Sequence, residues 1–214
     1  WLARAPLPRW FEALDPTAVG FGAWHEVLQC HPDRFETIYS DPRRPFGFAA
    51  CPGTDRVSMT TNGYFGAARD RFPVSAIDEL EPVAPQRRRV PAEVDGRGRR
   101  LRVESGHHMA VIRSGQYWEP AEGEQLADYE DALAPKLYAG MDHLRDRPDD
   151  TGTLSLRILT SLDPGTLAPR RETSVLGHFH SMAELEHWAA HHHTHLAIYE
   201  HAIEATRRYG ADRT

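Results

Sequence analysis

The sequence predicts an α+β fold in which helices flank an antiparallel sheet. Three observations carry this prediction. Between residues 108 and 180, three stretches have the alternation and composition of strands, and a stretch with helical spacing separates the first from the second. A capped helical run follows the third strand. The resulting order of strand, helix, strand, strand and helix is most of a ferredoxin-like unit, whose helices cover one face of the sheet.

The first part of the chain gives weaker signals. Residues 1–14 have the pattern of an amphipathic helix, and residues 21–29 alternate weakly, as a strand would. Proline and glycine between residues 41 and 53 predict a loop, and Pro73 ends the segment that follows a turn at residues 62–66. Because a ferredoxin-like unit leaves one sheet face uncovered, we expect a second sheet there, from these earlier strands or from a partner subunit.

Seven arginines occur within residues 87–102, where Pro91 and two glycines interrupt any regular structure. A surface that binds nucleic acid would require aromatic side chains for base stacking, and this stretch has none. A solvated hairpin or loop is the favoured interpretation. The net charge of -6 likewise gives no general affinity for nucleic acid or for an anionic membrane.

The middle of the chain contains the clearest elements. Residues 108–117 predict a strand, with Ala110, Ile112 and Ser114 on one face. A helix is expected to follow, through residue 145, because six apolar side chains keep helical spacing: Leu126, Tyr129, Leu133, Leu137, Met141 and Leu144. Pro135 is expected to kink this helix. Two further strands are predicted at residues 153–162 and 173–180, with a turn around Asp163, Pro164 and Gly165 between them.

Length and composition favour one domain over residues 1–214, since a chain of this size with 40% hydrophobic residues can bury one substantial core. No apolar stretch is long enough to span a bilayer, and no secretory segment opens the sequence. Cys30 and Cys51 are too few for a disulfide framework and fit a reducing compartment. We therefore expect a cytoplasmic protein with neither nucleic acid nor membrane as a partner.

Histidine is concentrated near the end of the chain, where 8 of the 13 histidines lie within residues 178–201. Residues 181–210 predict one continuous helix, because Ser181 and Glu184 form a capping-box pattern and a terminal glycine follows. The spacing predicts an inward stripe on this helix that consists of Leu185, Trp188, His192, His195, Tyr199 and Ala202.

Two histidines therefore share the predicted buried stripe. His187 and His191 lie off it and are expected to face solvent or the edge of the stripe. A single inward histidine would usually be a core residue that bonds to a backbone carbonyl. His192 and His195 together, among aromatic residues, indicate a metal or cofactor ligand as strongly as they indicate core histidines.

Several separated stretches of the chain resemble the haem-containing aldoxime dehydratases. Their order and approximate spacing agree with that family along nearly the whole chain. The stretches are Phe35-Glu36-Thr37-Ile38-Tyr39, Gly63-Tyr64-Phe65-Gly66, Arg69-Asp70-Arg71-Phe72-Pro73, Ile112-Arg113-Ser114-Gly115-Gln116-Tyr117-Trp118, Gly140-Met141-Asp142-His143-Leu144-Arg145-Asp146, Leu185-Glu186-His187-Trp188-Ala189 and Thr194-His195-Leu196-Ala197-Ile198.

The resemblance implies an enzyme, a lyase that removes water from an aldoxime, R-CH=N-OH, and leaves a nitrile. It implies haem b as the cofactor, ferrous in the active form and bound between the sheet and the C-terminal helix. It also implies a dimeric α+β barrel, which agrees with the ferredoxin-like order of elements. The expected partners are a small-molecule aldoxime and a second copy of the chain in a homodimer.

The resemblance also implies roles for four residues. In the family, a His-Pro-Thr-His sequence carries the proximal haem ligand on its last histidine, which corresponds to His195. Ser114 corresponds to the residue that holds the hydroxyl oxygen of the substrate, and Arg71 to a polar residue on the distal side. Glu36 is expected to support this distal network.

The chain differs from the family pattern in two respects. His193 replaces the proline of the His-Pro-Thr-His sequence, a change that is expected to leave coordination intact. Family members also extend before Trp1 and beyond Thr214, and the second extension carries their distal acid/base histidine. We therefore expect residues 1–214 to form a single haem-binding dehydratase domain that lacks both extensions.

Other functions are also open from the sequence. A related α+β barrel haem protein would use the same pocket for other nitrogen–oxygen or peroxide chemistry. A non-catalytic haem carrier would require a second axial ligand from elsewhere in the chain. In a different class, a binding protein would chelate zinc through His191 and His195, which are four residues apart on one predicted helix.

Overall fold

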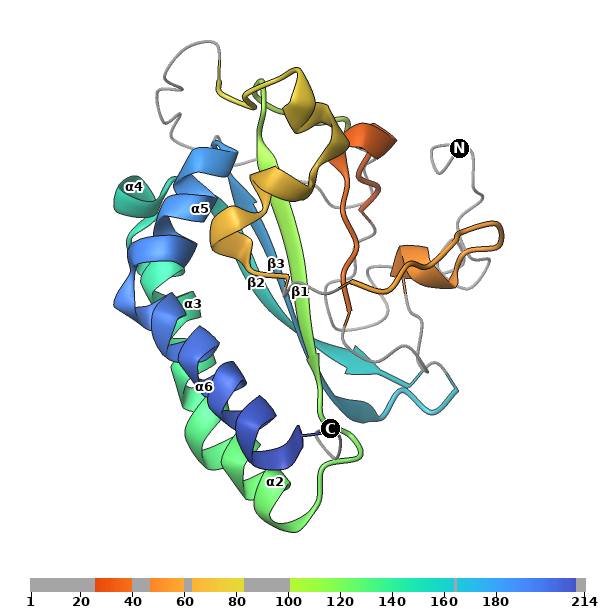
Figure 1. Cartoon of the computed structure of the whole chain (residues 1–214), viewed down its shortest axis with the longest axis vertical. Helices are drawn as coiled ribbons and strands as arrows, with labels where there is room; N and C mark the ends of the chain where they lie inside the picture. Colours follow the sequence, from red (N-terminus) through yellow and green to blue (C-terminus); the bar gives the residue numbers. More distant parts are fainter. Residues whose placement is uncertain (1–25, 40–46, 60–62, 83–100, 164, 211–214) are drawn as a thin grey trace, which may run out of the picture.

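The regular elements of the protein follow the order that the sequence predicts. The computed structural model describes residues 26–39, 47–59, 63–82, 101–163 and 165–210. Within these ranges, a strand, a helical stretch, two strands and two longer helices succeed one another. They form one three-stranded antiparallel sheet with helices on one side (Figure 1). The α+β class and the antiparallel sheet flanked by helices are therefore confirmed.

The sheet has the strand order β1-β3-β2, so the last strand of the sequence is the central one. The strands are β1 (Ala110–Tyr117), β2 (Thr153–Leu162) and β3 (Pro169–Phe179). β3 pairs antiparallel with both neighbours, and its register places Val175 opposite Ser114 of β1. All three predicted strands are present.

Asp163 explains the turn between β2 and β3. Its Oδ1 accepts hydrogen bonds from the backbone N–H groups of Gly165 and Thr166, at 3.0 and 2.8 Å. A short acidic side chain that bonds the backbone two or three residues later is a common way to close a turn. β3 begins earlier than predicted because the pairing continues down to Leu162 opposite Pro169.

The helical stretch after β1 is irregular at its centre. It consists of α2 (Gly123–Ala127), a π-helical segment η7 (Asp128–Leu133) and α3 (Ala134–Asp146). Pro135 accounts for the widening, because it has no N–H and its ring would clash with the carbonyl of the residue four positions earlier in a regular helix. The N–H of Ala134 bonds the carbonyl five residues earlier. The predicted kink takes the form of this widened turn, and a short helix, α4 (Pro148–Thr151), leads to β2.

The prediction of one continuous helix over residues 181–210 is wrong. Two helices occupy this region, α5 (Met182–His191) and α6 (His193–Tyr209). His192 separates them in an extended conformation, with φ -84° and ψ 130°, and its side chain accepts the backbone N–H of Thr194. A side chain that caps the next helix competes with continuation of the previous one. The capping box at the start of α5 is present, with Ser181 accepting the N–H of Glu184.

The break changes which histidines face inward. His195 is buried as predicted, but His192 is only half-buried and stacks on His143 of α3, with ring centroids 3.9 Å apart. His187 and His191 are exposed, as predicted. The two helices therefore do not share one continuous stripe, because the extended residue between them resets the rotation of α6.

The core lies between the sheet and the helices that stand on one side of it. Figure 1 shows α3, α5 and α6 together on that side. Phe179 and Leu144 are the largest side chains that are fully buried in the described ranges. Ile112 and Val175 contribute to the same cluster from the sheet. Since side chains alternate along a strand, Ser114 lies on the same face as Ile112, toward the helices.

Residues 26–39 and 47–59, red to orange in Figure 1, lie on the other side of the sheet from α3 and α6. Glu26 forms an ion pair with Arg157 of β2, with an N–O distance of 2.6 Å. The described ranges contain no second sheet, and residues 26–29 of the predicted strand have no regular structure. None of the described helices combines the length and apolarity needed to cross a membrane.

Two further predictions fall on residues outside the described ranges. These are the amphipathic helix at residues 1–14 and most of the arginine-rich stretch, at residues 87–100. Both stay predictions of the sequence.

Candidate functional site

His195 lies in the first turn of α6, within a wall of aromatic rings. Trp188 of α5 contacts the imidazole edge-on, with ring centroids 4.8 Å apart. Tyr64 and Phe65, from the segment that precedes β1, add rings at 6.2 and 6.4 Å. His195 is only 8% exposed as a result. The sequence prediction that this histidine faces inward among aromatic residues is confirmed.

The electrostatics of this environment keep His195 neutral. Burial lowers the pKa of the imidazole, and the nearby backbone carbonyl of Ala189 opposes this shift only in part. Near pH 7 the ring is therefore uncharged, the form in which histidine binds metal ions. Its Nδ1 is enclosed by protein atoms and makes no hydrogen bond of good geometry with the part of the chain that the structure describes. Nε2 is the ring nitrogen that is left to bind a metal ion.

The other buried histidine of α6 is different. Nε2 of His201 lies 3.0 Å from Oδ2 of Asp128, and its Nδ1 lies 3.1 Å from Nζ of Lys136. Because a lysine ammonium can only donate, Nδ1 accepts a hydrogen bond and Nε2 donates one. Both ring nitrogens of His201 are engaged, so its role is structural. The sequence analysis did not single out this residue, and of the two buried histidines it is His195 that can hold a ligand.

The aromatic rings over His195 belong to a segment that contains the 3-10 turns η4 (Phe65–Ala67) and η5 (Arg69–Arg71). The hydroxyl of Tyr64 donates to the carbonyl of Ala189, at 3.2 Å, which fastens the segment to α5. A Cβ at Gly66 would lie 2.6 Å from the Tyr64 ring, closer than Cβ atoms approach other atoms. The Gly-Tyr-Phe-Gly sequence therefore folds back on itself and places its rings against the imidazole.

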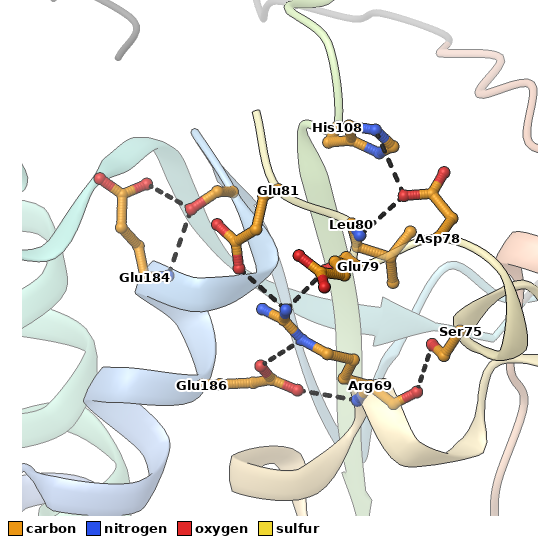
Figure 2. A network of polar contacts seen from close by, with 10 residues as sticks. Arg69, Ser75, Asp78, Glu79, Leu80, Glu81, His108, Glu184 and Glu186 are labelled. Carbon is orange, nitrogen blue, oxygen red and sulfur yellow. Dashed lines mark hydrogen bonds and ion pairs between the residues drawn. The ribbon is translucent and has the colours of Figure 1, made fainter. Parts of the chain in front are cut away.

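Arg69 provides a second attachment of this segment to α5 (Figure 2). Its Nε and its backbone N–H donate to the two carboxylate oxygens of Glu186, at 3.1 and 2.8 Å. Nη1 donates to Glu81 at 2.8 Å and to the carbonyl of Glu79. The hydroxyl of Ser75 donates to the carbonyl of Arg69, at 2.6 Å. The guanidinium of Arg69 thus connects the segment of η4 and η5 to α5 and to residues 79–81.

Arg71 and Glu36 form the second part of the site. Nε and Nη2 of Arg71 pair with the two carboxylate oxygens of Glu36. Nη1 donates to the carbonyls of Tyr64 and Ala67, at 2.9 and 3.0 Å. The side chains of Arg71 and Glu36 are 15% and 18% exposed. Four of the five guanidinium N–H groups are engaged by these described residues, which leaves one on Nη2 for another partner.

The structure brings three of the four predicted site residues into one connected group. Arg71 bonds Glu36 directly and bonds the backbone of Tyr64, whose ring contacts His195. Ser114 belongs to β1, on the sheet face that the helices cover. The described contacts do not join Ser114 to the other three residues.

The sequence analysis did not assign roles to Tyr64, Phe65, Trp188 or the pair of Arg69 and Glu186. The signal for them was the clustering of two aromatic residues and two arginines within residues 64–71. Nothing in the spacing indicated that Glu186, more than a hundred residues later, would be the partner of Arg69.

The described structure does not support a zinc site formed by His191 and His195. His191 and His195 lie on different helices, and His191 is exposed, with Nδ1 3.1 Å from the carbonyl of His187. No cluster of three or more potential metal ligands from histidine, cysteine and acidic residues occurs among the described residues. Among the described residues, the imidazole of His195 therefore has no neighbouring protein ligands with which it could complete a metal site.

Comparison with known proteins shows the family to which the chain is related. The phenylacetaldoxime dehydratase of Bacillus sp. (strain OxB-1) is 28% identical over 212 residues, which cover 98% of this chain and 59% of that protein. The aliphatic aldoxime dehydratase of Pseudomonas chlororaphis is 33% identical over 200 residues, or 93% of this chain and 56% of that protein. The chain thus spans somewhat more than half the length of the relatives it matches.

Solved structures agree with the sequence comparison. A crystal structure of an aldoxime dehydratase in complex with butyraldoxime superposes with a TM-score of 0.57 at 33% identity, over 68% of this chain and 40% of that one. Another aldoxime dehydratase structure gives a TM-score of 0.55 at 34% identity, over 68% of this chain and 41% of that one. The model of the family described as haem-containing dehydratase matches residues 1–214. The chain belongs to the haem-containing dehydratase family.

Proposed function

We propose that this chain forms the haem-binding part of an aldoxime dehydratase, an enzyme that converts R-CH=N-OH to a nitrile and water. The observation that carries the proposal is the state of His195, a neutral and enclosed imidazole in a chain of a haem-containing family. The complex of a relative with butyraldoxime supports the class of substrate.

The residues around His195 fit a porphyrin. The rings of Trp188, Tyr64 and Phe65 surround the imidazole with apolar surface, and the ring is neutral, as a nitrogen ligand to iron must be. We propose haem b in the ferrous state, with His195 as the proximal ligand and the haem between the sheet and α6. When bound, ferrous haem supplies an electron-rich metal that can hold an oxime through nitrogen.

The roles of the other three residues follow from the leaving group. The oxime loses its C–H hydrogen as a proton and its hydroxyl as water, and the departing oxygen carries negative charge until it is protonated. We assign the Ser114 hydroxyl to donate a hydrogen bond to that oxygen, and Arg71 to stabilise the charge with its remaining N–H group. Glu36 fixes the guanidinium plane through its two-point contact.

We further propose that the protein is a homodimer whose sheets complete an α+β barrel. Val111 of β1 points away from the helices and is 40% exposed, so it could contact a partner subunit at this face of the sheet. Light scattering of the purified protein tests this assembly. The cytoplasmic location stays a prediction; Cys30 and Cys51 are not joined in a disulfide, which fits a reducing compartment.

The ligand assignment is tested by the absorption spectrum of the haem-loaded protein, oxidised and then reduced with dithionite. We expect the His195→Ala variant to lose the spectrum of histidine-ligated haem. His191→Ala serves as the matched control, since His191 is exposed near the end of α5 and should leave the spectrum unchanged. An unchanged spectrum in His195→Ala would exclude this residue as the ligand.

The reaction is tested by incubating the reduced protein with an alkyl and an aryl aldoxime and measuring nitrile by gas chromatography. Ser114→Ala should retain haem but lose at least about tenfold in turnover, because it removes one donor to the leaving oxygen. Nitrile formation at a near-normal rate in Ser114→Ala would remove Ser114 from the mechanism. Absence of nitrile from the unaltered, haem-loaded protein would contradict the proposed function.

A further inference from the structure

Asp78 lies at a junction between three segments of the chain. Its Oδ2 accepts a hydrogen bond from Nη2 of Arg34 at 2.6 Å, and its Oδ1 lies 3.7 Å from Nε2 of His108. Nη1 of Arg34 lies 3.0 Å from Nδ1 of His108, which closes a triangle of polar contacts. We refer to Arg34, Asp78 and His108 as the Asp78 triad. Figure 2 shows the side of the triad formed by Asp78 and His108.

Each member of the triad is close in sequence to one of the proposed distal residues. Arg34 precedes Glu36 by two positions, and His108 stands just before β1, the strand that carries Ser114. Asp78 follows the segment that contains Arg71. The segments that contain Arg34, Asp78 and His108 do not pair as strands with one another in the described structure. The hydrogen bonds of the triad connect all three of these segments.

The backbone at this junction is in an unfavourable conformation. His108 has φ 57° and Leu80 has φ 60°, in the left-handed region that residues other than glycine rarely adopt. Two contacts keep Leu80 in this conformation. Its backbone N–H donates to Oδ1 of Asp78 at 2.8 Å, and its side chain is packed in the core and only 5% exposed. Strained residues persist where surrounding contacts impose them, and they concentrate at functional sites.

We propose that the Asp78 triad is a positioning device, which fixes the segments of Glu36, Arg71 and Ser114 relative to one another on the distal side. This inference rests on the proposed function for the roles of these three residues. Asp78 is then a positioning residue that does not touch the substrate. Its loss should displace the distal groups, and a displacement of about 1 Å can reduce turnover about a hundredfold.

The chemistry of the triad also makes it sensitive to pH. An arginine guanidinium can only donate, so Nδ1 of His108 must be unprotonated to accept the hydrogen bond from Arg34. Protonation of His108 would remove this bond and place two cations side by side. Burial lowers the pKa of His108, whereas Asp78 and Glu81 raise it and the neighbouring His107 ring and Arg34 lower it further. The contact between Arg34 and His108 is therefore intact at neutral pH and is lost in acid.

The first experiment compares Asp78→Asn with Asp70→Asn in the haem-loaded protein. Asparagine keeps the volume of Asp78 and an oxygen for the N–H of Leu80, but loses the charge that holds Arg34. Asp70 is an exposed carboxylate in the segment that contains Arg71. Asp70→Asn therefore removes the same charge outside the triad and serves as the control. Hydrogen–deuterium exchange is measured over residues 33–39 and 63–80, together with kcat, KM and the haem spectrum.

We expect Asp78→Asn to increase exchange in both segments by at least about tenfold. Its kcat should fall by at least about tenfold with a smaller change in KM and an unchanged haem spectrum. Asp70→Asn should change none of these quantities. The proposal is overturned if Asp78→Asn exchanges like Asp70→Asn, or if exchange increases while kcat does not change.

The second experiment uses His108→Asn. Asparagine tolerates a positive φ and can accept from Arg34, but it does not titrate. Protection of residues 33–39 against exchange, corrected for the intrinsic dependence of amide exchange on pH, should decrease between pH 7.5 and pH 5 in the unaltered protein and stay constant in His108→Asn. The same loss of protection in both proteins would overturn the role of His108. Absence of nitrile from the unaltered protein would contradict the proposed function, whereas the exchange data would still decide whether the triad fixes the segments relative to one another.

Discussion

At the scale of single residues, the site depends on which polar atoms are already satisfied. His195 and His201 are both buried on α6, but only His201 has partners for both ring nitrogens. Arg71 is held through most of its donors and yet keeps one N–H group beyond the described contacts. A fixed cation with one remaining donor is suited to stabilise charge at a single defined position.

Arg71→Lys tests whether the geometry of the guanidinium matters beyond its charge. A lysine ammonium cannot make the two-point contact with Glu36 and also bond two backbone carbonyls. We expect haem binding to persist and kcat for nitrile formation to fall by at least about tenfold. Arg145→Lys is the control, because Arg145 is an exposed residue that pairs with acidic neighbours on α3. Equal kcat values for the two variants would show that charge alone is sufficient.

At the scale of elements, the break between α5 and α6 and the attachment of residues 63–72 to α5 decide the shape of the site. His192 ends one helix and caps the next, which places His195 in the first turn of α6. Arg69 and Tyr64 then hold the aromatic segment against α5. The imidazole is enclosed because the cap at His192 sets the start of α6, and because the contacts of Arg69 and Tyr64 bring a segment that is distant in sequence against α5.

The cap is tested by His192→Ala and His192→Asn. Alanine removes the side chain that accepts the N–H of Thr194, and loss of such a cap costs about 0.5–2 kcal/mol. Asparagine is among the best N-cap residues, so it should restore most of that stability. Urea denaturation provides the free energies of unfolding. If the two variants were equally destabilised, the stacking on His143 would be the important contact and not the cap.

Glu186→Gln tests the attachment of the aromatic segment. Removal of the carboxylate charge weakens its contacts with the guanidinium and backbone of Arg69, and we expect about 1 kcal/mol of destabilisation for this partly exposed pair. Haem affinity should also decrease, because Tyr64 and Phe65 would be held less firmly over His195. Titration with haemin measures this effect. Glu200→Gln, at an exposed position of α6, should leave both quantities unchanged.

At the scale of the whole molecule, stability should depend on pH through buried and half-buried histidines that are neutral in the folded state. Burial is the largest cause of a lowered pKa at His108, His178, His192 and His195. In the unfolded chain these groups take up protons near their ordinary pKa, about 6.5, whereas in the folded chain they do so only at lower pH. The unfolded state therefore binds more protons in this range, and the free energy of unfolding rises with pH.

We accordingly expect the protein to be most stable above pH 7 and to lose stability as the pH falls from 7.5 to 5. Carboxyl groups with lowered pKa, such as Glu26 beside Arg157, add to this trend only at more acidic pH. Urea denaturation at pH 7.5, 6.5 and 5 measures the effect. His108→Asn should reduce the slope, because one of the four groups no longer titrates. A free energy of unfolding that stays constant across this range would contradict the prediction.

The sequence by itself determined the order of elements and the three strands from residue 108 onward, because alternation, helical spacing and turn residues are local signals. It also determined that His195 faces inward and that Pro135 disturbs its helix. It failed at His192, where the helical pattern continued through a residue whose side chain caps the next helix.

Only the tertiary structure decided which residues meet across long separations. The pairing of Arg71 with Glu36, of Arg69 with Glu186 and of Asp78 with Arg34 and His108 leaves no periodic trace in the sequence. The same holds for the difference between His195 and His201, since the partners of His201 come from another helical stretch. The physical reason is that side-chain periodicity records the face on which a residue lies, whereas ion pairs and hydrogen bonds depend on how the faces pack.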